Sequence, residues 1–179
     1  MSDADLPVHP ESNLPEPDDQ RRWVVVHVRP RCEKKLVAAV VRQGLTPYLP
    51  LQRRTHHYGS RVRSFDTPLF PGYAFAWGDV PGRQWLRQNR YTANLLEVSE
   101  QARLLDQLRQ LQVALRTGHV LEVLPYLQAG RRVRVEAGPL RGTEGIVARI
   151  KGQTRIVLNV DMIRESVSVE VDSALLVPV

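Results

Sequence analysis

Cationic and ring-bearing side chains gather in one stretch of the chain, residues 21–63. This stretch holds eleven Lys and Arg residues and one acid, which gives it a charge of +10. Lys and Arg neutralise phosphates and flat rings stack on unpaired bases, so the combination favours single-stranded nucleic acid. The residues expected to contact it are Arg29, Arg31, Lys34, Lys35, Arg53, Arg54, His56, His57, Tyr58, Arg61 and Arg63. Phosphate contacts carry no sequence preference, and the alternative is a solvated, charged hairpin.

No other pattern in the sequence supports catalysis or cofactor binding. There is no glycine-rich phosphate loop, no pair of carboxylates at a plausible spacing, and no Ser or Cys beside an ordered base. The pair His56-His57 lacks a third metal ligand, so both are better interpreted as polar hairpin residues. The single cysteine, Cys32, excludes an internal disulfide. The sequence therefore predicts a binding protein and not an enzyme, without a metal or cofactor.

The overall composition is that of a globular protein with a charged tail. The 179 residues are 42% hydrophobic and 25% charged, with a formal net charge of +6. Residues 1–20 carry six acids, four prolines and no Lys or Arg, so we expect a disordered acidic tail. No apolar run approaches the roughly 20 residues that a membrane span needs, and the N-terminus lacks a signal-like apolar segment. A cytoplasmic protein without membrane contacts is the simplest expectation.

Strand and helix patterns alternate after the tail. Trp23–Val28 is β-branched and continuous, which is typical of a strand buried on both faces. The further elements expected are a helix over 33–43 that ends at Gly44, a strand over 45–51, a hairpin tip at Tyr58-Gly59-Ser60, strands over 69–76 and 95–98, a short helix near 81–89, and a helix over 100–116 capped by Ser99. This order predicts an α+β fold, with an antiparallel sheet flanked by helices, over residues 21–117.

The pattern changes to short β-rich runs in the last third of the chain. These runs cover residues 132–135, 143–150, 154–160, 166–171 and 175–179. Five short strands, the early ones separated by glycines, predict a small SH3-like barrel over residues 128–179, because closure removes exposed sheet edges. We expect residues 118–127, which include Pro125, to form a linker between the two domains.

One glycine pattern in the last third is specific. A strand, a Gly138-Pro139 turn, and Gly142 and Gly145 at a spacing of three precede an alternating strand. Glycine allows a tight turn and the close approach of strands where a Cβ atom would not fit. The segment Gly130-Arg-Arg-Val-Arg-Val-Glu-Ala-Gly-Pro-Leu-Arg-Gly-Thr-Glu-Gly-Ile-Val147 resembles the KOW motif.

The first hundred residues resemble the N-terminal domain of the NusG family of transcription elongation factors. The resemblance rests on Trp23-Val-Val-Val-His27, on Arg29-Pro-Arg-Cys-Glu-Lys-Lys35 and on Pro68-Leu-Phe-Pro-Gly-Tyr-Ala-Phe75. Together with the KOW pattern it covers residues 21–179. The segment Val160-Asp-Met-Ile-Arg-Glu-Ser-Val-Ser-Val-Glu-Val171 is more similar to specialised RfaH-like antiterminators of polysaccharide operons than to the housekeeping protein.

The resemblance implies a set of contacts at RNA polymerase. Tyr73, Phe75 and Phe70 would belong to a patch that docks on the β′ clamp helices, although Tyr73, Phe75 or both could instead be core residues. The segment 83–90 would face the β side of the cleft, and its arginines could also be solvated helix charges. The non-template DNA strand would pass the basic block. Ala74 and Ala76 stand where the family usually has bulkier residues.

The expected function is transcription elongation or antitermination by a monomer that suppresses pausing or termination. By the resemblance, the KOW domain would recruit a small-subunit ribosomal protein, or Rho in a housekeeping factor. One alternative is a housekeeping factor of the family that acts with Rho in termination. An RNA-binding, ribosome-associated KOW protein is the alternative of another class. Some KOW domains of the family refold as a helical hairpin; here the Val, Ile, Thr and Ser content of residues 143–171 favours β-structure.

Overall fold

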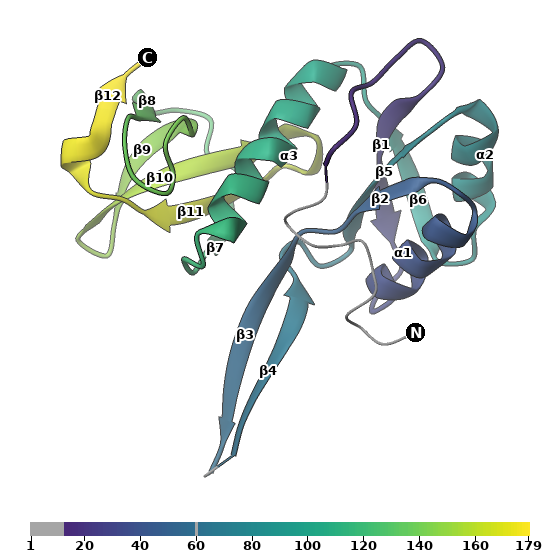
Figure 1. The fold of residues 1–179 in the computed structure, drawn as a ribbon, viewed down its shortest axis with the longest axis horizontal. Coiled ribbons are helices and arrows are strands. Elements are labelled where there is room, and N and C mark those ends of the chain that lie inside the picture. The colour runs from purple at the N-terminus through teal and green to yellow at the C-terminus, as the bar shows by residue number, and fades with distance from the viewer. Residues whose placement is uncertain (1–12, 60) are drawn as a thin grey trace.

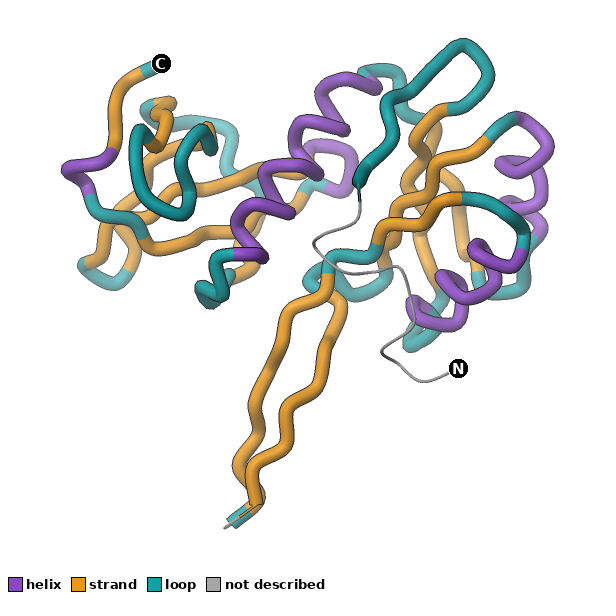
Figure 2. The backbone as a smooth tube through the Cα atoms, viewed as in Figure 1, coloured by secondary structure: helices purple, strands orange, loops and turns teal. Residues whose placement is uncertain are grey.

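Two β-sheets lie on either side of the long helix α3 (Gln101–Arg116) in the computed structural model (Figure 1). The structure describes residues 13–59 and 61–179. A third, two-stranded sheet projects away from both (Figure 2). The mixture of helices and antiparallel sheet that the sequence predicts for the first domain is confirmed.

The first sheet has the strand order β2-β5-β1-β6 and is antiparallel throughout. Its strands are β1 (Arg22–Val28), β2 (Thr46–Tyr48), β5 (Tyr73–Gly78) and β6 (Thr92–Glu97). Helices α1 (Glu33–Arg42) and α2 (Val80–Gln88) cover one face, where Val24, Val26 and Leu36 are buried together. Helix α3 covers the other face, where Trp23 and Val25 are buried. The central strand β1 is therefore covered on both faces, as its continuous apolar sequence predicts.

Helix α3 begins one residue later than the sequence suggests, at Gln101, with Glu100 and not Ser99 as the N-cap residue. No side chain caps this end. Instead, the Gln101 amide is bonded to the backbone of Trp23: its Oε1 accepts from the Trp23 N–H (2.7 Å) and its Nε2 donates to the Trp23 carbonyl (2.8 Å). This contact fixes the start of α3 to the central strand.

The projecting sheet is a long hairpin of β3 (Leu51–Tyr58) and β4 (Arg61–Pro68). Eight residue pairs hold it, from Leu51 opposite Pro68 to Tyr58 opposite Arg61. The sequence suggested one strand over 45–51, but the chain forms β2 and then starts β3 at Leu51. Ser60, at the expected tip, and the side chain of Tyr58 lie outside the described residues.

The C-terminal strands form a six-stranded sheet in the order β12-β8-β9-β10-β11-β7. They are β7 (Glu122–Pro125), β8 (Arg132–Val135), β9 (Glu144–Ile150), β10 (Gln153–Val160), β11 (Glu165–Glu170) and β12 (Leu176–Pro178). The five expected strands are present. The pairings in the described part of the chain do not close them into a barrel, since β12 and β7 form two separate edges of the sheet. Strand β7, within the expected linker, pairs with β11.

Gly145 meets the requirement that the KOW-like pattern suggests. A Cβ atom at Gly145 would lie 2.4 Å from the Val157 carbonyl oxygen, closer than packed atoms approach. Strands β9 and β10 therefore need glycine at this position. Gly138 and Gly142 have φ of +80° and +84°, so the turn between β8 and β9 uses a backbone conformation that favours glycine.

The folded unit begins before residue 21. Leu14 is 3% exposed and belongs to the same hydrophobic cluster as Trp23 and the apolar face of α3. The Trp23 indole Nε1 donates to the Pro15 carbonyl (2.9 Å), and Glu16 forms an ion pair with Arg109 of α3 (2.6 Å). Residues 13–16 are thus packed on the domain, in contrast to the expected disordered tail. Residues 1–12 of that tail lie outside the described residues.

Replacing Leu14 with Ala should lower the free energy of unfolding by about 2 kcal/mol or more, because it deletes a buried side chain and leaves a cavity. Denaturant unfolding of the full chain measures this. The control is Asn13→Ala, at an exposed neighbouring position. Equal stability of the two variants would show that this segment does not pack as described.

Candidate functional site

The main candidate site is an apolar groove of about 1000 Å³ at the base of the hairpin. One wall comes from hairpin residues, which include Arg54, His56 and Phe65. The opposite wall comes from the end of β1, the approach to α1 and the turn before β5, with Ala93 of β6 and Val123 of β7 at the margin. A concave, largely apolar surface with a few charged groups is typical of a binding site for another molecule.

Glu33 fixes the turn that forms one wall of this groove. Glu33 is 8% exposed, and its Oε1 accepts a hydrogen bond from the Gly72 N–H (2.8 Å). The Gly72 carbonyl accepts from the Val28 N–H (2.8 Å), and Gly72 has φ of +85°. These bonds join the start of α1, the end of β1 and the turn before β5, so the wall is held from three elements.

The three aromatic residues assigned to polymerase docking occupy different environments. Tyr73 is half-buried, and its ring stacks on that of His27 with 5.2 Å between centroids. Phe70 and Phe75 are 2% and 1% exposed, and Phe75 packs 6.2 Å from the ring of Tyr48. Both phenylalanines are therefore core residues, and Tyr73 is the member of the set with accessible surface.

The small residues of β5 have a packing reason. Ala74 and Ala76 are buried in the cluster of the α1- and α2-covered face, whereas Phe75 belongs to the cluster of the α3 face. Alternate residues of a strand point to opposite faces, so the alanines make room for α1 and do not line the same surface as Phe75.

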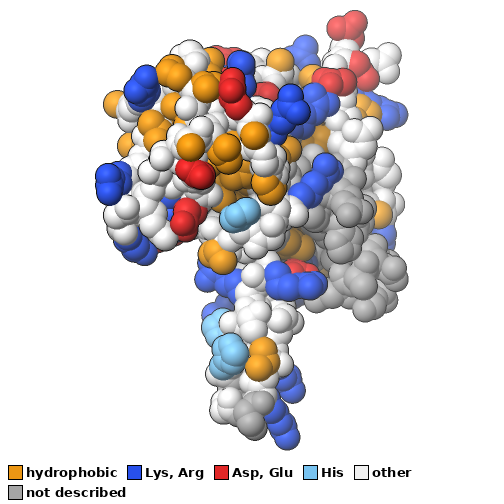
Figure 3. Space-filling view, turned by 60° about the vertical axis from the view of Figure 1, so that its left-hand side comes forward, with side chains coloured by type: hydrophobic (Ala, Val, Ile, Leu, Met, Phe, Trp, Pro, Cys, Tyr) orange, Lys and Arg blue, Asp and Glu red, His pale blue; other side chains and the backbone are white. Residues whose placement is uncertain are grey.

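The basic block is divided between several places. Arg31, with φ of +61°, and Arg54 both line the groove, although one precedes α1 and the other lies on β3. The groove lining does not include the cations Arg29, Lys34 and Lys35. Lys and Arg side chains also follow the projecting hairpin, together with histidines (Figure 3). The structure thus brings together Arg31 and the hairpin, but not the whole predicted set.

The hairpin has two chemically different faces. Residues whose numbers differ by two share a face, so the cross-strand register places Arg54, Phe65, His56, Arg63 and Arg61 on one side. Here the ring of His56 stacks on Phe65, with 5.0 Å between centroids and 10° between planes. His57 belongs to the other face, so adjacent histidines do not converge. Among residues 13–59 and 61–179, no group of three possible metal ligands occurs.

A second groove, of about 440 Å³, lies between α1 and α2 and was missed by sequence reasoning. It is lined by Arg42, Arg90, Trp85 and Tyr91, and the Arg90 guanidinium lies 4.8 Å from the centre of the Tyr91 ring. The segments that form it are distant in sequence, and the only local signal is the Arg90-Tyr91 pair. Cations beside rings are compatible with single-stranded nucleic acid here too.

The other arginines of segment 83–90 have partners within the domain. Arg83 donates to the Gly78 carbonyl (3.0 Å) and lies 3.8 Å from Glu97. Arg87 forms an ion pair with the same Glu97 at 2.6 Å. Of the three arginines considered for the β side of the polymerase cleft, Arg90 is the one that lines a groove.

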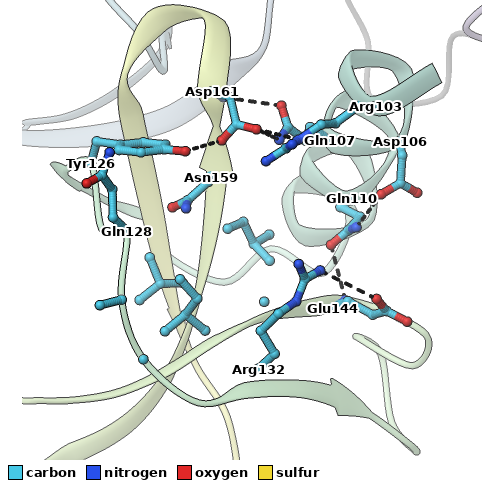
Figure 4. Close-up of a pocket in the computed structure, with 16 residues that line it drawn as sticks. Arg103, Asp106, Gln107, Gln110, Tyr126, Gln128, Arg132, Glu144, Asn159 and Asp161 are labelled. Carbon is cyan, nitrogen blue, oxygen red and sulfur yellow. Dashed lines mark hydrogen bonds and ion pairs between the residues drawn. The ribbon is translucent and has the colours of Figure 1, made fainter. Parts of the chain in front are cut away.

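A third, polar cavity of about 380 Å³ separates α3 from the C-terminal sheet (Figure 4). Asp161 makes most of the polar contacts that line this cavity. Its Oδ2 accepts a hydrogen bond from Gln107 of α3 (2.8 Å) and forms an ion pair with Arg103 (2.6 Å). Its Oδ1 accepts a hydrogen bond from the Tyr126 hydroxyl. The Glu144 N–H also donates to Gln110 of α3 (3.1 Å). Gly145 of the KOW-like pattern lines this cavity. The two sheets are therefore joined through α3 by specific polar contacts.

These contacts shift the pKa of Asp161 below its ordinary value. Burial opposes the charged carboxylate, but the hydrogen bonds from Tyr126 and Gln107 and the Arg103 guanidinium outweigh burial. The same hydrogen bond to Asp161, together with burial, raises the pKa of Tyr126. The charged form of Asp161 is thus the form that holds the interface together.

Comparison with known proteins gives a family match for the first domain. Residues 21–104 match the NusG family model, described as transcription termination factor nusG. This supports membership of the NusG family. The matched segment includes the hairpin, Tyr73 and the groove lining apart from Val123, and it indicates a factor of transcription elongation or termination in general. No curated protein matches the chain. Within the described residues, no helix is both long and apolar enough to cross a membrane.

Replacing Asp161 with Asn should weaken the contact between α3 and the C-terminal sheet by about 1–2 kcal/mol, since it removes charge-assisted hydrogen bonds. Hydrogen exchange at the amides of Asp161 and Glu144, which donate to α3, measures this. Exposed Asp19→Asn is the control. Unchanged protection in the Asp161 variant would contradict the description.

The same interface should weaken in acid. Because the pKa of Asp161 is lowered by packing, its contribution is complete above the ordinary value of 3.8 and is lost as the pH falls through the lowered value. Protection of the Glu144 amide should therefore fall in this window in the unsubstituted protein. The Asp161→Asn protein should lack this component of the pH dependence. Identical pH profiles of Glu144 protection in the two proteins would show that Asp161 does not cause this weakening.

Proposed function

We propose that this protein is a non-enzymatic transcription elongation factor that binds RNA polymerase across its cleft and suppresses pausing or termination. The observation that carries the proposal is the NusG family match over residues 21–104, the part of the chain that supplies the lining of the apolar groove apart from Val123. NusG family proteins generally bind RNA polymerase. The groove and the accessible Tyr73 supply an apolar surface with aromatic character, which suits a protein contact.

In this proposal the groove receives the β′ clamp helices, and the segment around Arg90 faces the β side of the cleft. Arg31, Arg54 and the hairpin would then lie beside the non-template DNA strand. Their positive charge supports this placement, because backbone neutralisation gives affinity without sequence preference. Binding at both sides of the cleft would favour the closed clamp and reduce pausing.

The C-terminal sheet would act as a KOW domain that recruits a second partner, a small-subunit ribosomal protein or Rho. Support comes from the glycine pattern and from the close β9–β10 approach at Gly145. Tethering this sheet to the polymerase-bound domain raises its effective concentration for that partner. For the sheet to move, both its polar contacts and its apolar packing with α3 would have to break.

A second candidate, a housekeeping factor that assists Rho in termination, is favoured by the family's description as a termination factor. Transcription in vitro on a template with a pause and a Rho-dependent terminator distinguishes the two. Increased readthrough supports antitermination, and increased Rho-dependent release supports the second candidate. If the protein changes neither readthrough nor Rho-dependent release, both candidate functions are wrong.

Ala93→Glu should reduce RNA polymerase binding at least tenfold, because it places a charge on the exposed margin of the apolar groove, where it would be desolvated on docking. A binding titration with core polymerase lacking nucleic acid measures this. The matched control is Asn94→Glu, an exposed neighbour outside the groove lining. Equal binding of both variants would place the polymerase contact elsewhere.

A further inference from the structure

We propose that the β3–β4 hairpin binds single-stranded nucleic acid with one face only, the face of Arg54, His56, Arg61, Arg63 and Phe65, called here the cationic face. The inference rests on the nucleic-acid part of the proposed function. It adds which side of the hairpin is used, which residues bind, and that unpaired bases are recognised by stacking.

The register separates the charges of the hairpin. On the cationic face Arg54 stands opposite Phe65, Arg63 opposite His56 and Arg61 opposite Tyr58, so three arginines share a face that the register gives no acid. On the opposite face Arg53 stands across from Asp66 and is paired with it at 3.3 Å. With neutral histidines, the cationic face carries +3 and the opposite face carries no net charge.

Two further polar side chains of the opposite face are hydrogen-bonded to each other. Thr55 and Ser64 are hydrogen-bonded across the strands at 3.0 Å, next to the Arg53–Asp66 pair. Cross-strand pairs of this kind stabilise a hairpin without any partner. On the cationic face, by contrast, the cross-strand pairs place cations beside rings, and like charges along one face repel each other. A polyanion would relieve that repulsion.

Phe65 explains why a single strand is favoured over a duplex. It is 40% exposed although it is a large apolar side chain, and its ring stacks on that of His56 among the arginines. Unpaired bases can stack on such rings, whereas a duplex keeps its base faces inside. An isolated two-stranded hairpin is only marginally stable in water, so a bound strand would also stabilise it.

The cationic face continues to the apolar groove. Arg54, His56 and Phe65 line the groove, with Arg31 on its other side. A strand bound along the hairpin would therefore lie directly beside whatever occupies the groove. This position is compatible with DNA held at the surface of a docked polymerase.

Two matched pairs of variants test the proposal in the full chain, with fluorescence anisotropy of a labelled oligothymidylate at several salt concentrations. The first pair removes one positive charge from either face. Arg63→Ala should weaken binding several-fold and reduce the salt slope by about one. Arg53→Ala, on the opposite face, should leave both the affinity and the slope nearly unchanged.

The second pair removes one exposed apolar side chain from either face. Phe65→Ala should weaken binding roughly 5- to 150-fold, which corresponds to the loss of one base–ring stack, while the salt slope stays constant. Val62→Ala, 58% exposed on the opposite face, should have little effect. Phe65→Trp, which keeps a flat ring, should retain binding and so exclude a general loss of hairpin structure.

The outcomes separate the inference from the proposed function. Equal losses from Arg63→Ala and Arg53→Ala would overturn the one-face proposal while nucleic-acid binding stands. If the unsubstituted protein does not bind the oligothymidylate, both the one-face proposal and the nucleic-acid part of the proposed function are wrong. The proposed docking on polymerase would not be affected. Stronger binding of a duplex than of the single strand would overturn recognition by stacking. Intact DNA binding with weakened polymerase binding would assign this face to an acidic protein surface.

Discussion

The packing of α3 between two sheets is the constraint on which the structure depends. Leu104, Leu105 and Leu108 are almost fully buried, and the cluster they belong to runs from Trp23 in the first sheet to Ile156 and Val167 in the C-terminal sheet. A single helix with an apolar stripe thus supplies core to both halves. The polar contacts of Asp161 and Glu144 with α3 set the orientation of the second sheet on this shared core.

This packing determines which surface is left for binding. Because α3 covers one face of the first sheet and α1 and α2 cover the other, Phe70 and Phe75 are drawn into the interior. What stays accessible is the rim: the turn held by Glu33, the ring of Tyr73, and the hairpin that leaves the sheet. Binding at this rim requires no rearrangement of the core. The rim also places an apolar groove next to several cations.

Much of the fold can be predicted from local sequence patterns. The β-branched run of β1, the helical stripe of α3 and the glycines of the KOW-like pattern each reflect a requirement of one element, and such requirements can be recognised locally. Leu14 was missed because one leucine among acids and prolines has no periodic pattern. Strand β7 was missed because a short segment with Pro125 pairs only when the edge of β11 is nearby.

The candidate site was predicted by composition but not by geometry. The excess of positive charge in residues 21–63 was evident, yet its division into a paired and an unbalanced hairpin face depends on a register of eight residue pairs. Arg42 and Arg90 line the same groove between α1 and α2, although no local sequence pattern connects them. Long-range contacts of this kind follow from the tertiary structure alone.

The most direct test of the central claim is site-specific photocrosslinking in a paused elongation complex. A photoreactive residue at position 93, on the margin of the groove, should attach to RNA polymerase. One at position 63, on the cationic face, should attach to the non-template strand. Attachment of both positions to the ribosome, or to neither polymerase nor DNA, would contradict the account.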